Sequence, residues 1–490
     1  MSPGDAAHLQ LPQPTITNLG CQSSTPGRKH KLNAYAFQQD AITSFNGYQY
    51  TAYWSNNGPD DGDTLYLYVA RRQLRPRSDA PVLNIEDKRN YEWEILELRD
   101  YKQTVDDGHN TVSLGICPGD GTIHLAFDHH CDTLRYRYSN RQVATHPHAV
   151  DWHPDIFSAT LDYLPGIPST HEPLRDVTYP RFVNLGEDIL FSHRDGKAGL
   201  GNDHLYTYSG KNGRWKYTGA YLTGVQSNPY VNGMTLRNDI LHVTWVYRGF
   251  VDYPGWDDPL DTKHKQQAGP NGAENNHNLC YAYSNACGRV WRNGAMEVVT
   301  DLRDPAKMSF DISKRERTIR NDAPGIVAFD IPKGKGLMNQ EAQTVDQDGG
   351  VHVLNRDMMD KNGTYLWKHY YREPYDGTWT QRALQTINEG SKRGQLAISK
   401  KGDLYAILPD STTKSMRILR ATKASGYADY REVWKGDGLG GEPLVDSARL
   451  EHDNTLSVFA RSDLVDSAEH PAEHTADSQA VVILDFELPV

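Results

Sequence analysis

DGTIHLAFDHHCDTLRYRYS, residues 120–139, is the stretch that decides the fold this sequence predicts. A turn with Asp and Gly opens a run of alternating apolar side chains. A second turn follows, and a run of alternating aromatic residues closes the stretch. Alternation with a period of two is typical of a strand with one buried face, and turn residues on both sides mark a hairpin. The stretch therefore predicts two antiparallel strands.

The same unit recurs about seven times along the chain. The other copies are GYQYTAYWSNN (47–57), GEDILFSHRDG (186–196), NDILHVTWVYRG (238–249), DGGVHVLNRDM (348–358), KGDLYAILPD (401–410) and DNTLSVFARSD (453–463). Short strands at this spacing predict four-stranded antiparallel blades. We therefore expect an all-β fold, a seven-bladed β-propeller in which the N- and C-terminal strands pair in one blade. It would form a single domain over residues 1–490, with blades from about residue 35 onward.

Two hairpins end in a Gly that is followed by a Trp two or three positions later. SGKNGRW (209–215) and SNACGRVW (284–291) are similar to degenerate Asp boxes, in which the turn caps a hairpin and the Trp packs between blades. A pair of β-sandwich domains, the alternative architecture, does not predict these closures. The connection over residues 250–276 is too long for a blade turn, and we expect a loop insertion that overhangs one face.

Composition and charge narrow the possible partners. The 490 residues contain 52 Lys and Arg against 63 Asp and Glu, a net charge of -11. This balance argues against a nucleic-acid partner, and an anionic ligand would need a local basic pocket. No apolar run approaches the roughly 18 residues of a membrane span, so no membrane partner is expected either. We expect a monomer.

The N-terminal residues and the cysteines bear on the cellular compartment of the protein. Residues 1–14 carry no apolar signal-peptide core, which suits a mature secreted chain, with the cytoplasm as the alternative. The five cysteines are Cys21, Cys117, Cys131, Cys280 and Cys287. Their odd number leaves at least one unpaired within the chain.

Six segments carry a more specific resemblance. They are GHN (108–110), FDHH (127–130), TYPRF (178–182), SHRDG (192–196), VYRG (246–249) and HNLCYAYS (277–284). Together they resemble the polysaccharide lyases with BNR-type seven-bladed propellers, which include ulvan lyases and the fungal L-rhamnose-α-1,4-D-glucuronate lyase. The resemblance covers the chain from about residue 40 onward. It implies β-elimination at a rhamnosyl α-1,4 bond to a uronic acid, in a polysaccharide or at glycan chain ends.

The same resemblance implies the residues of the site. The catalytic set falls on His109, His129, Tyr179 and Arg194. The substrate-binding set falls on Asn110, His130, Tyr247, Arg248 and His277. His130 stands directly beside His129, so which of the two imidazoles faces the substrate rests on alignment.

The chemistry explains these residue types. Elimination removes the C5 proton of a uronate, which is weakly acidic while the neighbouring carboxylate is anionic. The planar guanidinium of Arg194 can neutralise that carboxylate through two hydrogen bonds and stabilise the developing charge. An imidazole suits acid or base work near neutral pH. We favour His129 as the base and Tyr179 as the proton donor to the leaving oxygen, and the reverse assignment stays open.

One hairpin is expected to bring the two family histidines together. His109 and His129 lie twenty positions apart on either side of the turn PGDG (118–121). Antiparallel strands about such a turn return the chain to its starting level. Both rings are therefore predicted to reach the same rim of the propeller.

Metal patterns in the chain are weak. His277 and Cys280 form one short pair in HNLC, and residues 56–63 form an acidic loop without EF-hand spacing. We expect no metal in the site and no cofactor for catalysis, and a structural calcium or zinc ion is the open alternative.

The mode of cleavage and two rival functions stay open. An acidic chain without a basic stripe has little means of tracking a long polyanion, which favours an exo-acting lyase that releases L-rhamnose from side-chain ends of arabinogalactan or gum arabic. An endo-acting ulvan lyase is the first alternative. A sialidase-type hydrolase would need an arginine trio and a Tyr nucleophile with a Glu partner, and a lectin-like propeller would need only contacts that bind.

Overall fold

The computed structural model describes most of the chain as two compact units. The described residues are 10–22, 28–35, 40–56, 61–75, 92–258, 270–285, 287–303, 318–358, 365–387, 392–462 and 479–488. The first unit comprises residues 1–128, 135–161 and 390–490, and the second comprises 129–134 and 162–389. Among the described residues, no helix combines the length and apolar character needed to cross a membrane.

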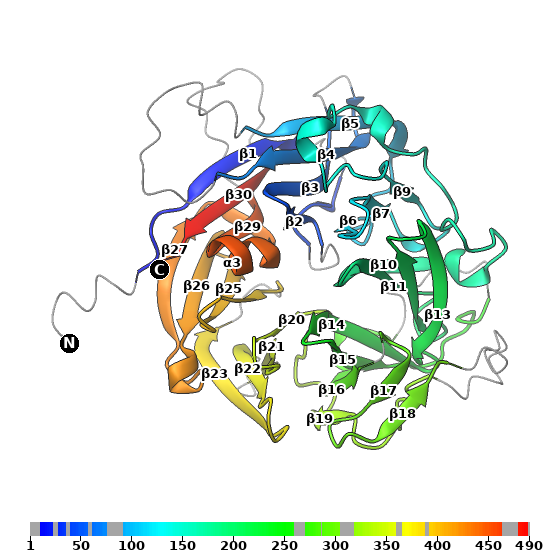
Figure 1. Ribbon diagram of the computed structural model, residues 1–490. Coiled ribbons are helices and arrows are strands. Elements are labelled where there is room, and N and C mark those ends of the chain that lie inside the picture. The colour runs from blue at the N-terminus through cyan, green and yellow to red at the C-terminus, as the bar shows by residue number, and fades with distance from the viewer. Residues whose placement is uncertain are drawn as a thin grey trace. The chain divides into compact units, whose positions relative to one another are not determined.

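The first unit contains four antiparallel sheets (Figure 1). One has the order β2 (Ile42–Phe45), β3 (Tyr48–Ser55), β4 (Leu65–Gln73) and β5 (Glu94–Gln103); the next has β6 (Val112–Ile116), β7 (Ile123–Phe127) and β9 (Tyr136–Tyr138). The third has β24 (Gln395–Ile398), β25 (Leu404–Asp410), β26 (Ser415–Ala421) and β27 (Arg431–Asp437); the fourth has β28 (Leu439–Val445), β29 (Thr455–Ser462), β30 (Gln479–Glu487) and β1 (Thr15–Gln22). A helix, α3 (Ser447–Asp453), joins β28 to β29.

The second unit contains three sheets. The first has the order β8 (His130–Asp132), β10 (Val177–Leu185), β11 (Asp188–Arg194), β12 (Asp203–Ser209) and β13 (Arg214–Leu222). The second has β14 (Ser227–Arg237), β15 (Ile240–Gly249), β16 (Asn276–Ser284), β17 (Val290–Arg292) and β18 (Val298–Asp301), with β19 (Val327–Phe329) paired to β16. The third has β20 (Ala342–Val345), β21 (Val351–Met358), β22 (Tyr365–Arg372) and β23 (Trp379–Ile387).

Each sequence repeat contains the first strand of a pair of neighbouring strands in one sheet. These pairs are β3–β4, β7–β9, β11–β12, β15–β16, β21–β22, β25–β26 and β29–β30. The seven sheets of the described residues confirm the predicted all-β class and the seven-bladed β-propeller. The extent of a single domain over residues 1–490 stays a prediction.

The two chain ends meet in one sheet, as predicted. Strand β1 pairs antiparallel with β30, with Thr15 opposite Asp485 and Thr17 opposite Ile483. Because β1 precedes residue 35, the last sheet takes its outer strand from ahead of the predicted start of the blades. The N-terminal strand thereby covers an edge of the last sheet that would otherwise expose its hydrogen-bonding groups.

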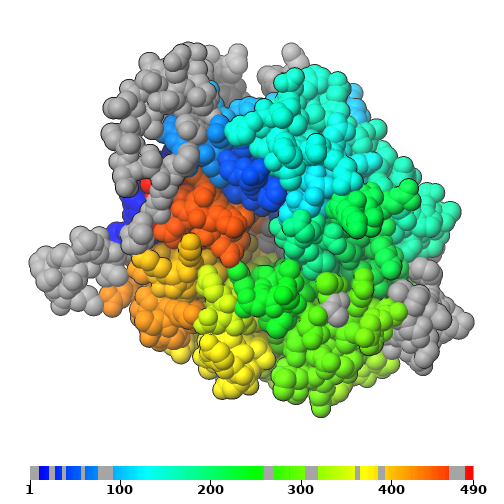
Figure 2. Space-filling view, in the orientation of Figure 1, coloured from blue at the N-terminus to red at the C-terminus, as the bar shows by residue number. Residues whose placement is uncertain are grey.

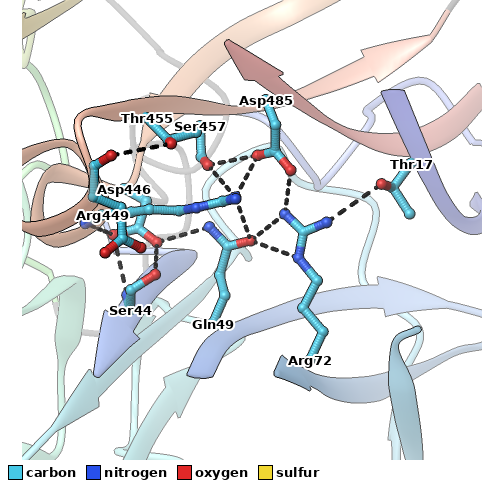
Figure 3. A network of polar contacts seen from close by, with 10 residues as sticks. Thr17, Ser44, Gln49, Arg72, Asp446, Arg449, Thr455, Ser457 and Asp485 are labelled. Atoms are coloured by element: carbon cyan, nitrogen blue, oxygen red, sulfur yellow. Dashed lines mark hydrogen bonds and ion pairs between the residues drawn. The ribbon is translucent and has the colours of Figure 1, made fainter. Parts of the chain in front are cut away.

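A buried ionic network ties this closing sheet to the sheet that begins with β2 (Figure 3). Asp485 on β30 accepts from Arg72 at 2.5 Å and from Arg449 at 2.6 Å. Gln49 on β3 accepts from Arg72 at 2.6 Å and donates to Asp446 at 2.8 Å. Burial by itself raises the pKa of Asp485, but Arg72 and Arg449 outweigh burial and hold it below the usual value.

Helix α3 continues the same junction. Asp446, the residue before the helix, accepts from the backbone N–H of Ser44 on β2 at 3.0 Å and from its hydroxyl at 2.5 Å. In the space-filling view, the orange surface around α3 lies against the blue surface of the β2–β3 region (Figure 2). The first and last sheets of the sequence are thus joined by charge-assisted bonds as well as by apolar packing.

Replacing Asp485 is expected to destabilise the protein. Asp485→Asn keeps the shape but leaves Arg72 and Arg449 buried without their counter-charge, and breaking a buried pair costs about 3 kcal/mol or more. Urea unfolding measures the free energy. Glu432→Gln, which removes an ion pair with Arg417 whose side chains are 44% and 37% exposed, is the control and should change stability by less than about 0.5 kcal/mol. Equal effects of the two variants would contradict this role.

Three repeats place a histidine at equivalent points of their first strand. In GTIHLAF, DILHVTW and GGVHVLN these are His124, His242 and His352. The Nδ1 atom of His124 lies 2.6 Å from the Tyr136 hydroxyl, and that of His242 lies 2.9 Å from the Tyr281 hydroxyl. His352 makes the same contact at 3.0 Å with the ring of His369. These rings are buried structural links to the next strand, so His124 has a different role from the histidines at the strand ends.

The buried histidines predict acid sensitivity. Burial lowers the pKa of His124 to about 3 and that of His242 to about 4, against about 6.5 for an unfolded chain. The unfolded state therefore binds more protons below pH 6.5, so stability is complete above that value and falls as the pH drops toward the folded pKa values.

His124→Gln should remove the contribution of one protonation site to this pH dependence of stability. As the pH falls from about 5.5 to 4, the free energy of unfolding of the variant should decrease less steeply than that of the wild type. The difference between the two slopes should be about 1.4 kcal/mol per pH unit. Urea unfolding across this range provides the measurement. His153→Gln, at a side chain that is 66% exposed, is the control. An unchanged slope in His124→Gln would show that His124 does not carry the predicted proton linkage.

The closure at residues 284–291 packs as predicted. Trp291 stacks on Tyr221 of the neighbouring sheet, with ring centroids 5.1 Å apart, and its indole N–H donates to the Gly288 carbonyl at 2.8 Å. The Ser284 hydroxyl accepts from Gly288 N–H at 3.1 Å, which caps the turn. Ala286, at the usual Asp position, lies outside the described residues.

Two predicted loops are described only in part. The insertion at 250–276 is described over 250–258 and from 270 onward, and residues 259–269 lie outside the described ranges. The acidic loop at 56–63 likewise lacks 57–60. Among the described residues, Cys117, Cys131, Cys280 and Cys287 form no disulfide, which confirms that the chain keeps cysteines outside disulfides.

Candidate functional site

Arg194 is a buried cation that makes no ion pair with another described residue. It ends β11, and only 2% of the residue is exposed. Its guanidinium carbon lies 5.0 Å above the Tyr179 ring, and its Nη2 atom lies 3.7 Å from the Cys131 sulfur. Within the described part of the chain, no carboxylate lies at ion-pair distance and Nε has no hydrogen-bond partner. A buried guanidinium of this kind favours an anionic ligand.

Tyr179 is held in an unusual backbone conformation beside this cation. Its φ of 59° is in the left-handed region, at a point where the register of β10 against β11 shifts between Thr178 and Arg181. For an aromatic residue this conformation is strained, and such strain concentrates at functional sites. Burial raises the pKa of the Tyr179 phenol, while Arg194 and Arg248 act in the opposite direction. The positive charges of Arg194 and Arg248 thus make the phenolate more stable than it would be if burial acted alone.

Tyr230 and Arg248 extend the cluster onto the next sheet. The rings of Tyr179 and Tyr230 have centroids 6.0 Å apart, and the Arg248 guanidinium carbon lies 4.8 Å above Tyr230. Arg248 donates to Asn276 at 2.8 Å and to Asn339 at 3.1 Å, which are neutral amides. The cluster of Arg194, Tyr179, Tyr230 and Arg248 is therefore the local basic site that an acidic chain needs for an anionic ligand.

The short strand β8 brings His130 and Cys131 to the same sheet. His130 pairs in register with Thr178, the residue before Tyr179. The Cys131 N–H donates to the Thr178 hydroxyl at 2.8 Å. Both residues are thus fixed next to the strand that carries Tyr179. His129 precedes β8 and is almost fully buried.

His109 lies in the first unit and is oriented by a carboxylate. Its Nδ1 atom is 2.6 Å from Asp107 Oδ1, and the same oxygen accepts from the His109 backbone N–H. A carboxylate on Nδ1 sets the tautomer and makes Nε2 the basic nitrogen. The predicted hairpin also forms, with Val112 opposite Phe127. Since His129 belongs to the second unit, the meeting of the two rings stays a prediction.

Asn110 has a structural partner. Its side-chain amide donates to Asp128 at 2.6 Å, and its backbone carbonyl accepts from the Trp54 indole at 2.9 Å. Asp128 also accepts from Gln103 at 3.0 Å and from the Tyr101 hydroxyl. These contacts hold the end of β7, and the predicted contact of Asn110 with substrate stays a prediction.

Tyr247 and His277 pair with each other. Their rings stack with centroids 6.0 Å apart, and Tyr247 belongs to the apolar core cluster of the second unit. Cys280 lies in the same core, where burial raises the pKa of its thiol. A neutral buried thiol is a poor zinc ligand, because the metal takes the thiolate. HNLC thus reads as strand residues.

Sequence reasoning missed Asp107, Cys131 and Tyr230. Asp107 stands two residues before His109, so a search for carboxylates near each imidazole would have found it. Tyr230 follows Pro229 at the start of β14, much as Tyr179 precedes Pro180 at the start of β10. Cys131 carries no such signal, because only the pairing of β8 with β10 brings it to Arg194.

The fold and this cluster define a β-propeller with a buried, arginine-rich polar site. The chain belongs to the BNR repeat-containing family, whose model matches residues 48–387. A comparison with curated proteins found no match.

Among solved structures, the chain is similar to polysaccharide lyase Uly1, with a TM-score of 0.67 and 16% identity over 98% of this chain and 100% of that one. It is also similar to a PL25 ulvan lyase, with a TM-score of 0.55 and 13% identity over 92% of both chains. A PL25 ulvan lyase bound to -[GlcA(1-4)Rha3S]- gives a TM-score of 0.57 and 13% identity over 91% of this chain and 93% of that one. At these identities the likeness shows a shared fold.

Proposed function

We propose that this protein is a polysaccharide lyase that cleaves an L-rhamnosyl-α-1,4-D-glucuronate bond by β-elimination. The observation that carries the proposal is Arg194, a buried guanidinium that makes no ion pair among the described residues and is packed on the strained Tyr179. Support comes from the names of the most similar solved structures, which are polysaccharide lyases.

Arg194 would bind the uronate carboxylate. Two N–H groups of the planar guanidinium match the two carboxylate oxygens. Neutralising that carboxylate makes the C5 proton more acidic and stabilises the enolate-like charge that develops as the proton leaves. Stacking on Tyr179 limits the rotation of the guanidinium, so less conformational freedom is lost on binding.

The proton transfers are assigned to His129 and Tyr179. His129 takes the C5 proton, and the Tyr179 phenol protonates O4 of the leaving rhamnose. Arg194 over the Tyr179 ring and Arg248 over the neighbouring Tyr230 support this role, because their charges stabilise the phenolate left after the proton has been given up. His109, with Asp107 on its Nδ1 atom, would present Nε2 to the substrate.

The proposed substrate is the end of a polysaccharide chain. We propose exo action that releases L-rhamnose from termini of arabinogalactan or gum arabic, by a monomer that works outside the cell without a cofactor. Endo-acting cleavage of ulvan is the second candidate, and a specific observation favours it: one similar structure is a PL25 ulvan lyase bound to -[GlcA(1-4)Rha3S]-.

One assay separates these functions. The purified protein is incubated with gum arabic and with ulvan, and the ultraviolet absorbance of the unsaturated uronate and the released sugars are followed. Free rhamnose from gum arabic together with rising absorbance supports the exo lyase. Mixed oligosaccharides early in the ulvan digest, without rhamnose from gum arabic, identify the ulvan lyase. Cleavage without absorbance indicates a hydrolase, and binding without cleavage indicates a lectin.

A further inference from the structure

One face of the sheet that carries Arg194 changes from apolar to polar along β11. Leu190, Ser192 and Arg194 alternate onto the same face, because residues two apart on a strand point the same way. Leu190 belongs to the apolar core, whereas Arg194 belongs to the candidate site. The polar end of this face therefore lies directly against the core of the second unit.

Asp203 occupies the polar end of that face. It pairs in register with Arg194, which puts the two side chains on the same face as direct cross-strand neighbours. Only 2% of Asp203 is exposed, and its Oδ1 atom lies 3.9 Å from Nη1 of Arg181. Within the described residues, its Oδ2 atom has no hydrogen-bond partner. Asp203 is thus a buried carboxylate in the electrostatic field of Arg181 and Arg194, and one of its oxygens accepts no hydrogen bond from a described residue.

The groups that face Asp203 come from every neighbouring element. They are Arg181 on β10, Arg194 on β11, Asp195 after β11, His204 on β12, Tyr221 on β13 and Tyr247 on β15. Burial raises the pKa of Asp203 to about 6 even though Arg181 and Arg194 oppose the rise. Asp195 differs, because His204 at 2.9 Å and the Asn202 N–H hold its pKa below the usual value despite burial.

We propose that Asp203 is a further residue of the uronate site, which takes up a proton when a carboxylate binds at Arg194. This inference rests on the proposed function, since it assumes that Arg194 receives the uronate. The bound carboxylate adds a second negative charge to the arginine field in a poorly screened interior, and like charges disfavour each other there. The proton comes from solvent and returns to it when the ligand leaves. Protonated Asp203 thereby keeps Arg194 in position and does not compete with the bound uronate for its charge.

The pH dependence of affinity has a definite sign. Below about pH 6, Asp203 is already protonated in the free protein, so affinity does not change as the pH falls further. Above that value, binding needs proton uptake, and affinity weakens by up to tenfold per pH unit. Asp203→Asn, which is neutral at every pH, should bind as tightly as the protonated wild type and lose this dependence.

Calorimetric titration with D-glucuronate tests the proposal. At pH 7, the binding heat is measured in two buffers of different ionisation enthalpy, which counts the protons taken up. The wild type should take up close to one proton, Asp203→Asn close to none, and the control Asp195→Asn as many as the wild type. If Asp203→Asn fails to fold, binding without proton uptake in the wild type still overturns the proposal.

Binding without proton uptake in the wild type, or uptake that persists in Asp203→Asn, overturns the proposal, as does a wild type that does not bind glucuronate at any pH. The elimination assay gives a separate answer. Glucuronate binding with proton uptake but without an unsaturated product supports Asp203 and contradicts the lyase function.

Discussion

Arg194→Ala is expected to lower kcat/KM for elimination by about 10³ or more. The variant removes the guanidinium that is proposed to hold the uronate carboxylate through two hydrogen bonds. Removal of a single well-placed donor to developing charge already costs about 10²–10³ in rate. The rate of appearance of ultraviolet absorbance on the cleaved polysaccharide gives the measurement.

Arg194→Lys is the matched variant. It keeps the positive charge but has a single ammonium in place of the planar fork, and it cannot stack on Tyr179 in the same way. We expect it to recover little of the lost activity. Thermal melting of both variants checks that the sheet around β11 still folds. Near wild-type activity in Arg194→Lys would show that another group holds the carboxylate.

His129→Gln is expected to lower kcat by about 10²–10⁴ with a much smaller effect on binding. Glutamine fills a similar space but cannot accept and release the C5 proton, and general acid–base assistance is worth a factor of this size. Substrate affinity depends mainly on Arg194 and the other binding contacts, so the inactive variant should still retain the polysaccharide. Single-turnover rates and equilibrium binding separate the two effects.

His130→Gln is the control for that experiment. The two histidines are neighbours in the sequence, and His130 is fixed in β8 by its pairing with Thr178. The proposed roles predict that His130→Gln weakens binding modestly and keeps turnover. If His130→Gln instead abolishes turnover while His129→Gln does not, the base has been assigned to the wrong imidazole.

Much of the fold could be predicted because its signals are local. Alternation in stretches such as 120–139 and 238–249, with turn residues at both ends, depends only on which face of a strand is buried. The same locality made Trp215 and Trp291 recognisable as packing residues, and both are buried.

The site could be predicted only in part. Arg194 and Tyr179 were found through short segments that resemble a family, whereas Asp203 carries no local signal and Tyr230 has only its neighbouring Pro229. Tyr230 is fifty-one positions from Tyr179 in the sequence, and only packing between two sheets places their rings 6.0 Å apart. The roles of the predicted catalytic residues await the experiments above.

By itself, the sequence determined the number and kind of the sheets, because period-two burial and turn chemistry act between near neighbours, and closing the repeats into a ring implied the pairing of the two chain ends. Only the tertiary structure decided that His124 and His242 are structural and that Asp203 shares a face with Arg194. Those facts depend on strand register and on burial. Register and burial are products of packing across the whole sheet, and they alone set which charges meet without water between them.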